Sequence, residues 1–491
     1  MLFAKLLVVL ASALPTIAST FKDKIKRTGI DATFPGDPSY LSASSPFNLR
    51  FTWKPAVVTY PENPEEVSQL VQIAVQYNVQ VVALSGGHSY IANGLGGQSG
   101  VLVVDLRNLG KVTVDSSEGT AVIETGNRLG DVATALANAG RALPHGTCAY
   151  VGIGGHAAYG GFGFTSRQWG LTLDTIIAIN VVLANGTISR VTNETDPDLF
   201  WAFRGAGGSF GLVTSYEVKT FPAPPSATVF EYQWFLDIAT AAKGISAFQS
   251  FVQTDIPLQF GAEVNFEKGQ TSGTLSFTLV GGWYAPVQGL QAVLAPFLRQ
   301  MPANPEVTLN TGTYLNSVRV LAGGSLDTKP PESHDTFYVK SLMTPTNSPM
   351  SDAAVLALSR YLSVEGFASQ TEWFVQLELY GGRNSAINNV PRDATSFVNR
   401  DSLFTFQFYA SSPGKVPPYP QYGFTFLDGA VKSVVSNSPA NWEYGAYPNY
   451  VDDMLLDWRL RYYGSHYTRL QALKKKYDPR NLFRFPTGID P

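Results

Sequence analysis

The order of hydrophobic and polar residues predicts a mixture of helices and strands in the first part of the chain. Asn63-Pro64-Glu65-Glu66 supplies a helix N-cap, a proline at the first helical position and a capping-box glutamate, and apolar residues recur at helical spacing through Val75. A second helix is expected at 128–139. Short runs rich in β-branched residues predict strands at 79–84, 101–106 and 121–124. We therefore expect these elements to share one core.

The pattern changes near residue 221, where the proline cluster F-P-A-P-P interrupts it. Long alternating segments follow at 260–266, 274–280, 373–379 and 403–408, as expected for an antiparallel sheet with one face toward helices and the other open to a ligand. Two closing helices are predicted at 452–463 and 465–477, ended by Asp478-Pro479. The expected fold class is α+β, with a domain boundary between residues 222 and 223.

Composition and the N-terminus narrow the class of protein. Residues 1–19 have the pattern of a secretory signal, with Lys5, an apolar run, and small residues at Ala18 and Ser19 for cleavage, so we expect a secreted, extracellular protein. No later stretch reaches the roughly 18 apolar residues that a membrane helix needs. A net charge of -3 with 15% charged residues argues against a nucleic-acid surface. Two sequons, at Asn185 and Asn193, are candidate glycosylation sites.

Candidate chemistry gathers in glycine-marked loops. His88 lies in S-G-G-H-S-Y over 85–90, and Cys148, the single cysteine, lies in H-G-T-C-A-Y over 145–150. A lone thiol cannot form an internal disulfide and needs another explanation. Glycine-rich segments at 152–163 and 204–211 would let backbone N–H groups approach a phosphate or pyrophosphate.

Three other kinds of site are weighed against these loops. Residues 152–157 satisfy the dinucleotide fingerprint, but 145–150 is a poor strand, and the glycines at 160, 161 and 163 would break the helix that the fingerprint should open. His88, Cys148 and His156 lack the ligand spacing of a structural zinc site, so no metal is expected. The sequence contains no G-x-S-x-G nucleophile elbow, which argues against Ser/His/Asp hydrolysis.

Five ordered motifs together resemble a known family. They are S-G-G-H-S-Y, then G-T-C-x-x-V-G-x-G-G-H about 60 residues later, L-F-W-A-F-R-G-A-G-G-S-F-G-L-V at 199–213, N-Y at 449–450, and K-Y-D-P-R-N-L-F at 476–483. From about residue 45 onward the chain resembles the berberine-bridge-enzyme-like FAD-linked oxidases, and within them the secreted fungal gluco-, chito- and xylooligosaccharide oxidases.

The resemblance implies a two-domain PCMH-type, vanillyl-alcohol-oxidase-like flavoprotein. Its FAD-binding domain would span 20–222, its substrate domain, with a large antiparallel sheet flanked by helices, 223–448, and a C-terminal segment, 449–491, would return to the FAD domain. FAD would be attached covalently through His88 at the flavin 8α-methyl and through Cys148 at C6. Further cofactor-binding positions by motif match are Ser85, Gly86, Gly87, Ser89, Gly152, Gly154, Gly155, His156, Gly161, Val213 and Asn449.

The same resemblance implies catalytic and substrate residues. Tyr450 would take the proton of the sugar's anomeric hydroxyl, assisted by Glu378, which stands where the family has the shorter aspartate. Substrate contacts would be Tyr90, Glu263, Gln376 and Gln407. A glutamate at 263 can accept a hydrogen bond from a C2 hydroxyl, whereas an N-acetyl group would clash or leave the carboxylate unpaired, which favours gluco- or xylo-configured sugars.

The expected activity is oxidation of the C1 hydroxyl of reducing oligosaccharides to the lactone by a monomeric enzyme, with O2 reduced to H2O2. One alternative is a dehydrogenase that passes electrons to quinones, because the branched Ile153 lies in the loop expected to face the flavin edge and could hinder O2. An oxidase of secondary metabolism, or a flavin-bearing protein without turnover, would share the same flavin motifs.

Overall fold

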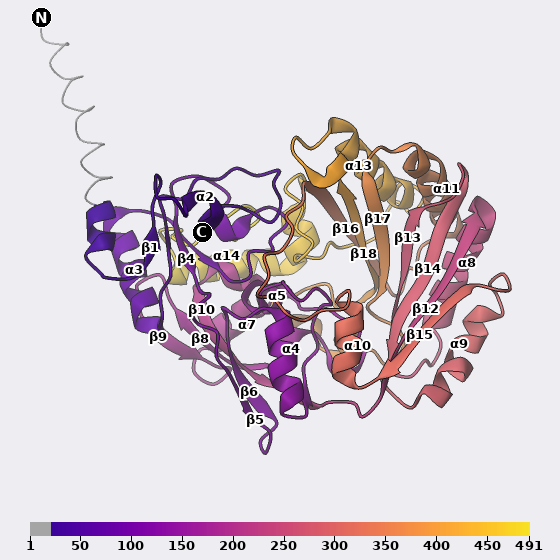
Figure 1. Cartoon of the computed structure of the whole chain (residues 1–491), viewed down its shortest axis with the longest axis horizontal. Helices are drawn as coiled ribbons and strands as arrows, with labels where there is room; N and C mark the ends of the chain where they lie inside the picture. The colour runs from indigo at the N-terminus through magenta and orange to yellow at the C-terminus, as the bar shows by residue number, and fades with distance from the viewer. Residues whose placement is uncertain (1–20) are drawn as a thin grey trace, which may run out of the picture.

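The structure is a computed structural model that describes residues 21–491 and forms two lobes side by side (Figure 1). The expected signal segment, 1–19, lies outside the described residues. Both lobes combine sheets with helices, so the predicted α+β class is confirmed. Within residues 21–491, no helix is both long enough and apolar enough to cross a membrane.

The first lobe contains two main sheets. The four-stranded sheet has the order β1 (Ala32–Thr33), β2 (Val57–Thr59), β4 (Leu102–Asp105), β3 (Val81–Leu84). The five-stranded antiparallel sheet has the order β5 (Val112–Asp115), β6 (Thr120–Glu124), β10 (Leu212–Lys219), β8 (Ile176–Val182), β9 (Ile188–Val191). A small pair joins β7 (Arg141–Ala142) to β11 (Phe221–Pro222). The helices of this lobe are α2 (Tyr40–Ala43), α3 (Pro64–Tyr77), α4 (Leu129–Asn138), α5 (Ile153–Tyr159), α6 (Ser166–Trp169) and α7 (Pro197–Ala206).

The predicted elements of this lobe form, and they place the chemical loops. Asn63 caps α3 by accepting from the Glu66 amide at 2.9 Å, and β3 ends immediately before Ser85. No strand forms at 145–150, and α5 is only seven residues long, because it ends at Gly160. Both features confirm the reasons for rejecting a dinucleotide fingerprint at 152–157.

The second lobe is built on a seven-stranded antiparallel sheet. Its order is β15 (Glu306–Gly312), β12 (Ala227–Asp237), β14 (Thr274–Trp283), β13 (Phe260–Lys268), β17 (Glu372–Leu379), β18 (Ser402–Ser411), β16 (Phe337–Pro345). The principal helices are α8 (Ile238–Val252), α9 (Leu290–Leu298), α10 (Tyr314–Leu321), α11 (Asp352–Ala368), α12 (Ala386–Asn389) and α13 (Gln421–Val435). Alternate residues of β13, β17 and β18, such as Val264, Leu377 and Phe406, pack with α8, α11 and α13 in one core. The other face of these strands is thereby free to line a site.

The C-terminal segment returns to the first lobe. There α14 (Tyr467–Tyr477) packs beside α7, and the buried Lys474 donates to the Ser209 carbonyl at 2.7 Å. The helix predicted at 452–463 is wrong: only a single π-helical turn forms, at Arg459–Tyr463. The buried Asp452 carboxylate accepts from Tyr338 and Lys340 of β16, and these tertiary bonds override the helical pattern.

The two predicted domain boundaries remain predictions. The sheets of the first lobe end with β11 at Pro222, and the large sheet begins with β12 at Ala227. The lobes also meet through helices, since α10 of the second lobe lies beside α4 of the first (Figure 1).

Candidate active site

A cavity of about 1020 Å³ extends from the glycine loops of the first lobe to the open sheet face of the second. Of the residues predicted to bind cofactor or substrate or to act in catalysis, all line this cavity except Gly161. They are Ser85, Gly86, Gly87, His88, Ser89, Tyr90, Cys148, Gly152, Gly154, Gly155, His156, Val213, Glu263, Gln376, Glu378, Gln407, Asn449 and Tyr450. The fold thus brings residues from seven separate segments of the sequence to one space.

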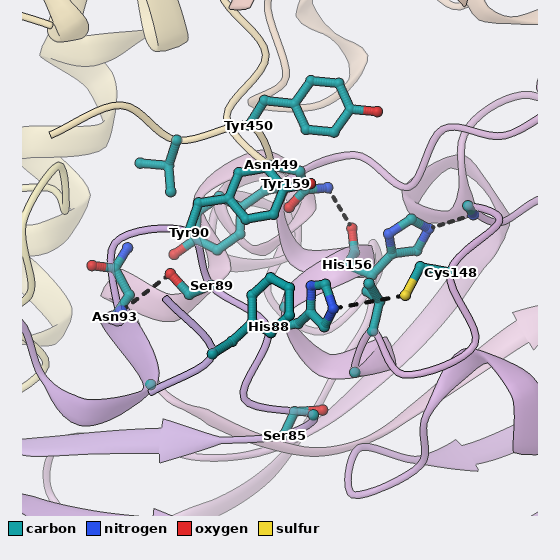
Figure 2. Close-up of a pocket in the computed structure, with 18 of the residues that line it drawn as sticks. Ser85, His88, Ser89, Tyr90, Asn93, Cys148, His156, Tyr159, Asn449 and Tyr450 are labelled. Carbon is teal, nitrogen blue, oxygen red and sulfur yellow. Dashed lines mark hydrogen bonds between the residues drawn. The ribbon is translucent and has the colours of Figure 1, made fainter. Parts of the chain in front are cut away.

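His88 and Cys148 point toward one another across this cavity (Figure 2). The Cys148 Sγ lies 3.7 Å from His88 Nε2, and the same nitrogen lies 2.9 Å from Glu332 Oε1. Burial by itself lowers the pKa of His88, but Cys148 and Glu332 outweigh burial and raise it to about 9. Burial raises the pKa of the Cys148 thiol, but His88 outweighs it and lowers that pKa. The pair therefore favours a thiolate beside an imidazolium, which makes Cys148 a ready nucleophile.

Close backbone packing holds the loops that carry these two residues. A Cβ atom on Gly86 would collide with the backbone of Gly152, and a Cβ on Gly152 would collide with the backbone of Gly86. The Ser85 hydroxyl donates to the Thr125 carbonyl and accepts from the Gly154 amide. Glycine is required here for close approach of two loops.

His156 acts on the loop that bears Cys148. Its Nε2 accepts from the Gly146 amide at 3.1 Å, and its carbonyl accepts from the Asn449 side chain at 3.1 Å (Figure 2). Burial, with a smaller effect of His145, lowers the pKa of His156 to about 3, so the ring is neutral and able to accept. His156 thus lines the cavity and holds Gly146, two positions before Cys148.

The sheet face across the cavity carries four polar side chains side by side. Glu263 of β13 pairs in register with Glu378 of β17, and Gln376 of β17 pairs with Gln407 of β18. Gln376 Nε2 donates to Glu263 Oε1 at 2.9 Å. Burial raises the pKa of Glu263 to about 7, and burial together with Glu263 raises the pKa of Glu378 well above its usual value. The second carboxylate oxygen of Glu378 has no hydrogen-bond partner among the described residues.

Tyr450 connects this face to the first lobe. Its hydroxyl donates to Glu378 Oε1 at 2.6 Å, so the extra methylene of Glu378 does not prevent contact. The Tyr450 ring stacks on Tyr90, with centroids 6.0 Å apart and planes at 11°, and the Tyr90 hydroxyl accepts from Gln407 Nε2 at 2.7 Å. Burial and Glu378 raise the pKa of Tyr450 well above its usual value. A free phenolate is therefore strongly disfavoured, and proton sharing with Glu378 is favoured.

Sequence reasoning missed two residues of this site. The Tyr447 hydroxyl accepts from the amides of Gly161 and Phe162 and from the Asn449 side chain, at 2.9, 3.1 and 3.1 Å. Tyr447 lies three positions before Tyr450, so the N-Y motif could have drawn attention to it. Glu332 carries no such signal, because it lies 244 positions from His88.

Several predicted positions have other surroundings. Gly161 has φ +90°, and its amide bonds Tyr447, so it shapes a turn behind the cavity wall. Ile153 is 1% exposed in the core of the first lobe and does not line the cavity, so the structure gives no support there to restricted O2 access. Asn185 and Asn193 are exposed.

His88, Cys148 and His156, which were weighed as zinc ligands and rejected on their spacing, do not all belong to one group of donor atoms. His88, Cys148 and Glu332 offer donor atoms within 4.8 Å of one another, an arrangement that could hold a metal ion. His156 is outside this group, since its Nε2 is committed to the Gly146 amide.

Comparisons with known proteins agree with the site. Residues 55–192 match the FAD binding domain family, and residues 446–490 match the family described as berberine and berberine like. The chain is 34% identical to the chitooligosaccharide oxidase of Gibberella zeae over 99% of this chain and 97% of that protein. FAD is thus the cofactor of this protein.

Solved structures extend the likeness to the whole fold. A xylooligosaccharide oxidase from Myceliophthora thermophila, solved with xylobiose, superposes with a TM-score of 0.88 at 32% identity, covering 96% of this chain and 99% of that one. The glucooligosaccharide oxidase of Acremonium strictum, described as carrying 6-S-cysteinyl, 8α-N1-histidyl FAD, superposes with a TM-score of 0.89 at 31% identity and the same coverage. The expected PCMH-type flavoprotein fold is confirmed, and the chain belongs to the berberine-bridge-enzyme-like family of FAD-linked oxidases.

Proposed function

We propose that this protein is a secreted carbohydrate oxidase that converts the anomeric C1 hydroxyl of reducing oligosaccharides to the lactone and reduces O2 to H2O2. The observation that carries the proposal is the Tyr450–Glu378 hydrogen bond of 2.6 Å, which faces the same cavity as His88 and Cys148. The signal pattern of residues 1–19 and the exposed sequons at Asn185 and Asn193 support secretion and glycosylation.

His88 and Cys148 are proposed as the two attachment points of FAD. Their side chains are 3.7 Å apart, and the flavin 8α-methyl and C6 lie on one edge of one ring, so two such neighbouring residues fit a doubly attached flavin. The thiolate favoured at Cys148 suits bond formation to carbon. The glycine loops leave room beside them, since the cavity of about 1020 Å³ is a suitable size for a large cofactor.

When bound, FAD supplies the acceptor for the hydride that leaves C1 of the sugar. The protein's own residues handle the proton. Tyr450 takes the C1 hydroxyl proton while it passes its own proton to Glu378, because the raised pKa of Tyr450 opposes a free phenolate at every stage. The high proton affinity of Glu378 favours this transfer, provided that its carboxyl group is ionised before the sugar reacts.

Substrate selection is assigned to the polar face of β13, β17 and β18. Glu263, held by Gln376, offers a carboxylate to the C2 hydroxyl of the reducing sugar. An N-acetyl group at C2 lacks that hydroxyl donor and adds bulk beside a buried carboxylate. The proposed substrates are therefore cello- or xylo-type oligosaccharides.

Further sugar units are proposed to stack on aromatic side chains at the same face. Phe374 and Tyr409 line the cavity and lie parallel to one another, with centroids 4.8 Å apart and planes at 10°. Flat aromatic surfaces suit the apolar faces of sugar rings. Affinity should therefore rise from a monosaccharide to its oligomers.

The deciding experiment is a screen for anaerobic flavin bleaching over cellobiose, xylobiose, N,N'-diacetylchitobiose and their monosaccharides. Cellobiose or xylobiose should bleach the flavin, and air should then restore the colour with formation of H2O2. Bleaching by a dye-coupled route without H2O2 in air would instead support a dehydrogenase. Failure of every sugar would reject the carbohydrate assignment and favour an oxidase of secondary metabolism or a protein without turnover.

A further inference from the structure

A loop of the second lobe crosses to the first lobe and covers the attachment residues. This crossing loop, residues 327–335, lies between α10 and β16. At its start, Arg128 Nη1 donates to the Thr328 carbonyl at 2.9 Å, and the Thr328 hydroxyl donates to Asp131 at 2.9 Å. The Tyr150 hydroxyl then donates to the Pro330 carbonyl at 3.1 Å.

The other end of the crossing loop is fixed as firmly. The Asp335 amide donates to the Phe47 carbonyl at 3.1 Å, and the Leu49 amide donates to the Asp335 carbonyl at 2.7 Å. The Asp335 carboxylate accepts from the hydroxyls of Tyr409 and Ser411 at 2.9 and 2.7 Å. None of these bonds involves Glu332, so the loop has its own anchors at both ends.

Glu332 lies between these anchors and faces His88. Its Oε1 is 2.9 Å from His88 Nε2, with the two side chains only 20% and 11% exposed. The His88 ring stacks on Phe47 at 3.8 Å between centroids, which fixes the ring plane. Among the described residues, the side chains that hydrogen-bond His88 are Glu332 and Cys148. The carboxylate therefore determines which imidazole nitrogen carries the proton.

We propose that Glu332 is a positioning residue for covalent attachment of FAD to His88, an inference that rests on the attachment proposed above. Once the imidazolium has given up its Nδ1 proton, Glu332 keeps the remaining proton on Nε2, so that the lone pair of Nδ1 is the nucleophile. Bond formation at Nδ1 makes the imidazole a cation in a largely buried place. The adjacent carboxylate offsets that charge, as the buried aspartate does for histidine in a Ser-His-Asp triad.

The attachment step balances with O2 as oxidant. The methyl group at C8 of the flavin loses a proton, Nδ1 of His88 forms a bond to that carbon, and the two electrons of the broken C–H bond remain in the ring system. The Nε2 proton of the alkylated imidazole then leaves to Glu332. Overall, one methyl hydrogen and the imidazole hydrogen are lost, and O2 takes up two electrons and two protons to become H2O2.

The test uses the Cys148→Ala protein, in which only the histidyl bond can retain FAD. Glu332→Ala and Glu332→Gln are each added to it, and the covalent fraction is followed by the FAD that stays with the protein after denaturation, during incubation with FAD in air. The control is Glu267→Ala, which removes an exposed carboxylate that lines the same cavity. Circular dichroism and total FAD content, bound covalently or not, report folding.

We expect Glu332→Ala to slow attachment by about tenfold or more, as losses of ligand-orienting partners do elsewhere. Glu332→Gln keeps an acceptor for the Nε2 proton but no charge, so its attachment rate should lie between those of Glu332→Ala and the parent. Glu267→Ala should attach FAD at the parent's rate. If FAD attaches to both Glu332 variants at the parent's rate, the proposed role of Glu332 is wrong, but the histidyl attachment still stands. Release of all FAD by the Cys148→Ala protein itself would overturn the histidyl attachment as well.

Discussion

At the residue scale, the site depends on carboxyl groups that hold protons more tightly than usual. Glu378 and Glu263 are buried on adjacent strands, and each raised pKa has burial as its main cause. Among residues 21–491, no cationic side chain pairs with either group: Glu263 accepts from the Gln376 amide, and Glu378 accepts from the Tyr450 hydroxyl. The protonation state of Glu263 should therefore change near pH 7, and that of Glu378 should change well above the usual range of a carboxyl group.

The first prediction concerns the pH dependence of turnover. Because Tyr450 passes its proton to an ionised Glu378, kcat/KM should rise with pH through the raised pKa of Glu378. Glu378→Gln should slow flavin reduction by about 100-fold or more and abolish the rise of kcat/KM with pH, whereas Glu378→Asp should keep this rise. Stopped-flow reduction at several pH values measures this. If kcat/KM of Glu378→Gln still rises with pH in the same way, another group is responsible for the pH dependence.

The second prediction removes the base. Tyr450→Phe should lower the rate of flavin reduction by a factor of about 100 to 10,000, the usual contribution of a positioned acid or base, while the bound flavin and its colour remain. Tyr90→Phe is the matched comparison, since it removes the hydroxyl of the ring stacked on Tyr450 but not the bond to Glu378. Equal losses in the two variants would contradict a distinct role for Tyr450.

The third prediction concerns stability. The pKa of Glu263 is raised from 4.5 to about 7, so between these values the folded protein binds a proton that the unfolded chain has lost. This contribution to stability is present below about pH 4.5 and is lost as pH rises through 7, an effect of about 3 kcal/mol. Glu263→Gln should therefore lose less Tm than the parent between pH 4.5 and 7.5. Glu267→Gln, an exposed change on the same strand, should show the same dependence of Tm on pH as the parent. If Glu263→Gln shows that same dependence, the raised pKa of Glu263 is contradicted.

At the element scale, strand register and one tyrosine hold the two halves of the site together. The pairings Glu263 with Glu378 and Gln376 with Gln407 put all four side chains on one face, and a slip of one residue would turn a strand's polar groups into the core. Tyr447 connects the segment after the sheet to the Gly160–Phe162 turn. The position of Tyr450 thus depends on contacts made by its neighbour.

The fourth prediction tests that connection. Tyr447→Phe removes a hydroxyl that accepts three hydrogen bonds, leaving the amides of Gly161 and Phe162 without this acceptor, and should cost about 2–4 kcal/mol. Thermal unfolding should show a lower Tm and flavin reduction should slow. Tyr467→Phe is the control, because among the described residues its hydroxyl accepts a hydrogen bond from the exposed Arg459 alone. An unchanged Tm in Tyr447→Phe would mean that water replaces the hydroxyl.

Elements with local signals could be predicted from the sequence, and those set by distant contacts could not. The Asn63 cap and the glycines that end α5 act within a few residues, and both were predicted. The helix expected at 452–463 failed because Asp452 bonds residues of β16 more than a hundred positions away. Glu332 could not be assigned for the same reason, and Tyr450 was found only because family motifs flank it.

At the scale of the whole molecule, one continuous cavity is lined by residues of both lobes, and we propose that it takes both the cofactor and the substrate. The first lobe contributes His88 and Cys148, the second contributes Glu263 and Glu378, and the crossing loop joins them above His88. Loss of the cofactor would remove contacts from both lobes at once. Binding of FAD should therefore stabilise the packing of the lobes as well as the loops that touch it.

The fifth prediction follows from the aromatic surface that Phe374 and Tyr409 form in the lining of this cavity. Phe374→Ala should raise KM for a tetrasaccharide by about 2- to 12-fold, corresponding to about 0.5–1.5 kcal/mol for a lost aromatic contact, while KM for the monosaccharide changes little. Steady-state H2O2 release over a series of chain lengths measures this. Equal increases for all lengths would place Phe374 beside the reducing sugar.

The C-terminal segment also imposes an order on the making of the enzyme. Tyr447, Asn449 and Tyr450 follow every strand of the described part of the chain, whereas His88 and Cys148 precede the large sheet altogether. The ribosome therefore delivers the two proposed attachment residues before Glu332, and Glu332 before the proposed base Tyr450. Covalent attachment should wait for the crossing loop that carries Glu332, and turnover should wait for the C-terminal segment that carries Tyr450.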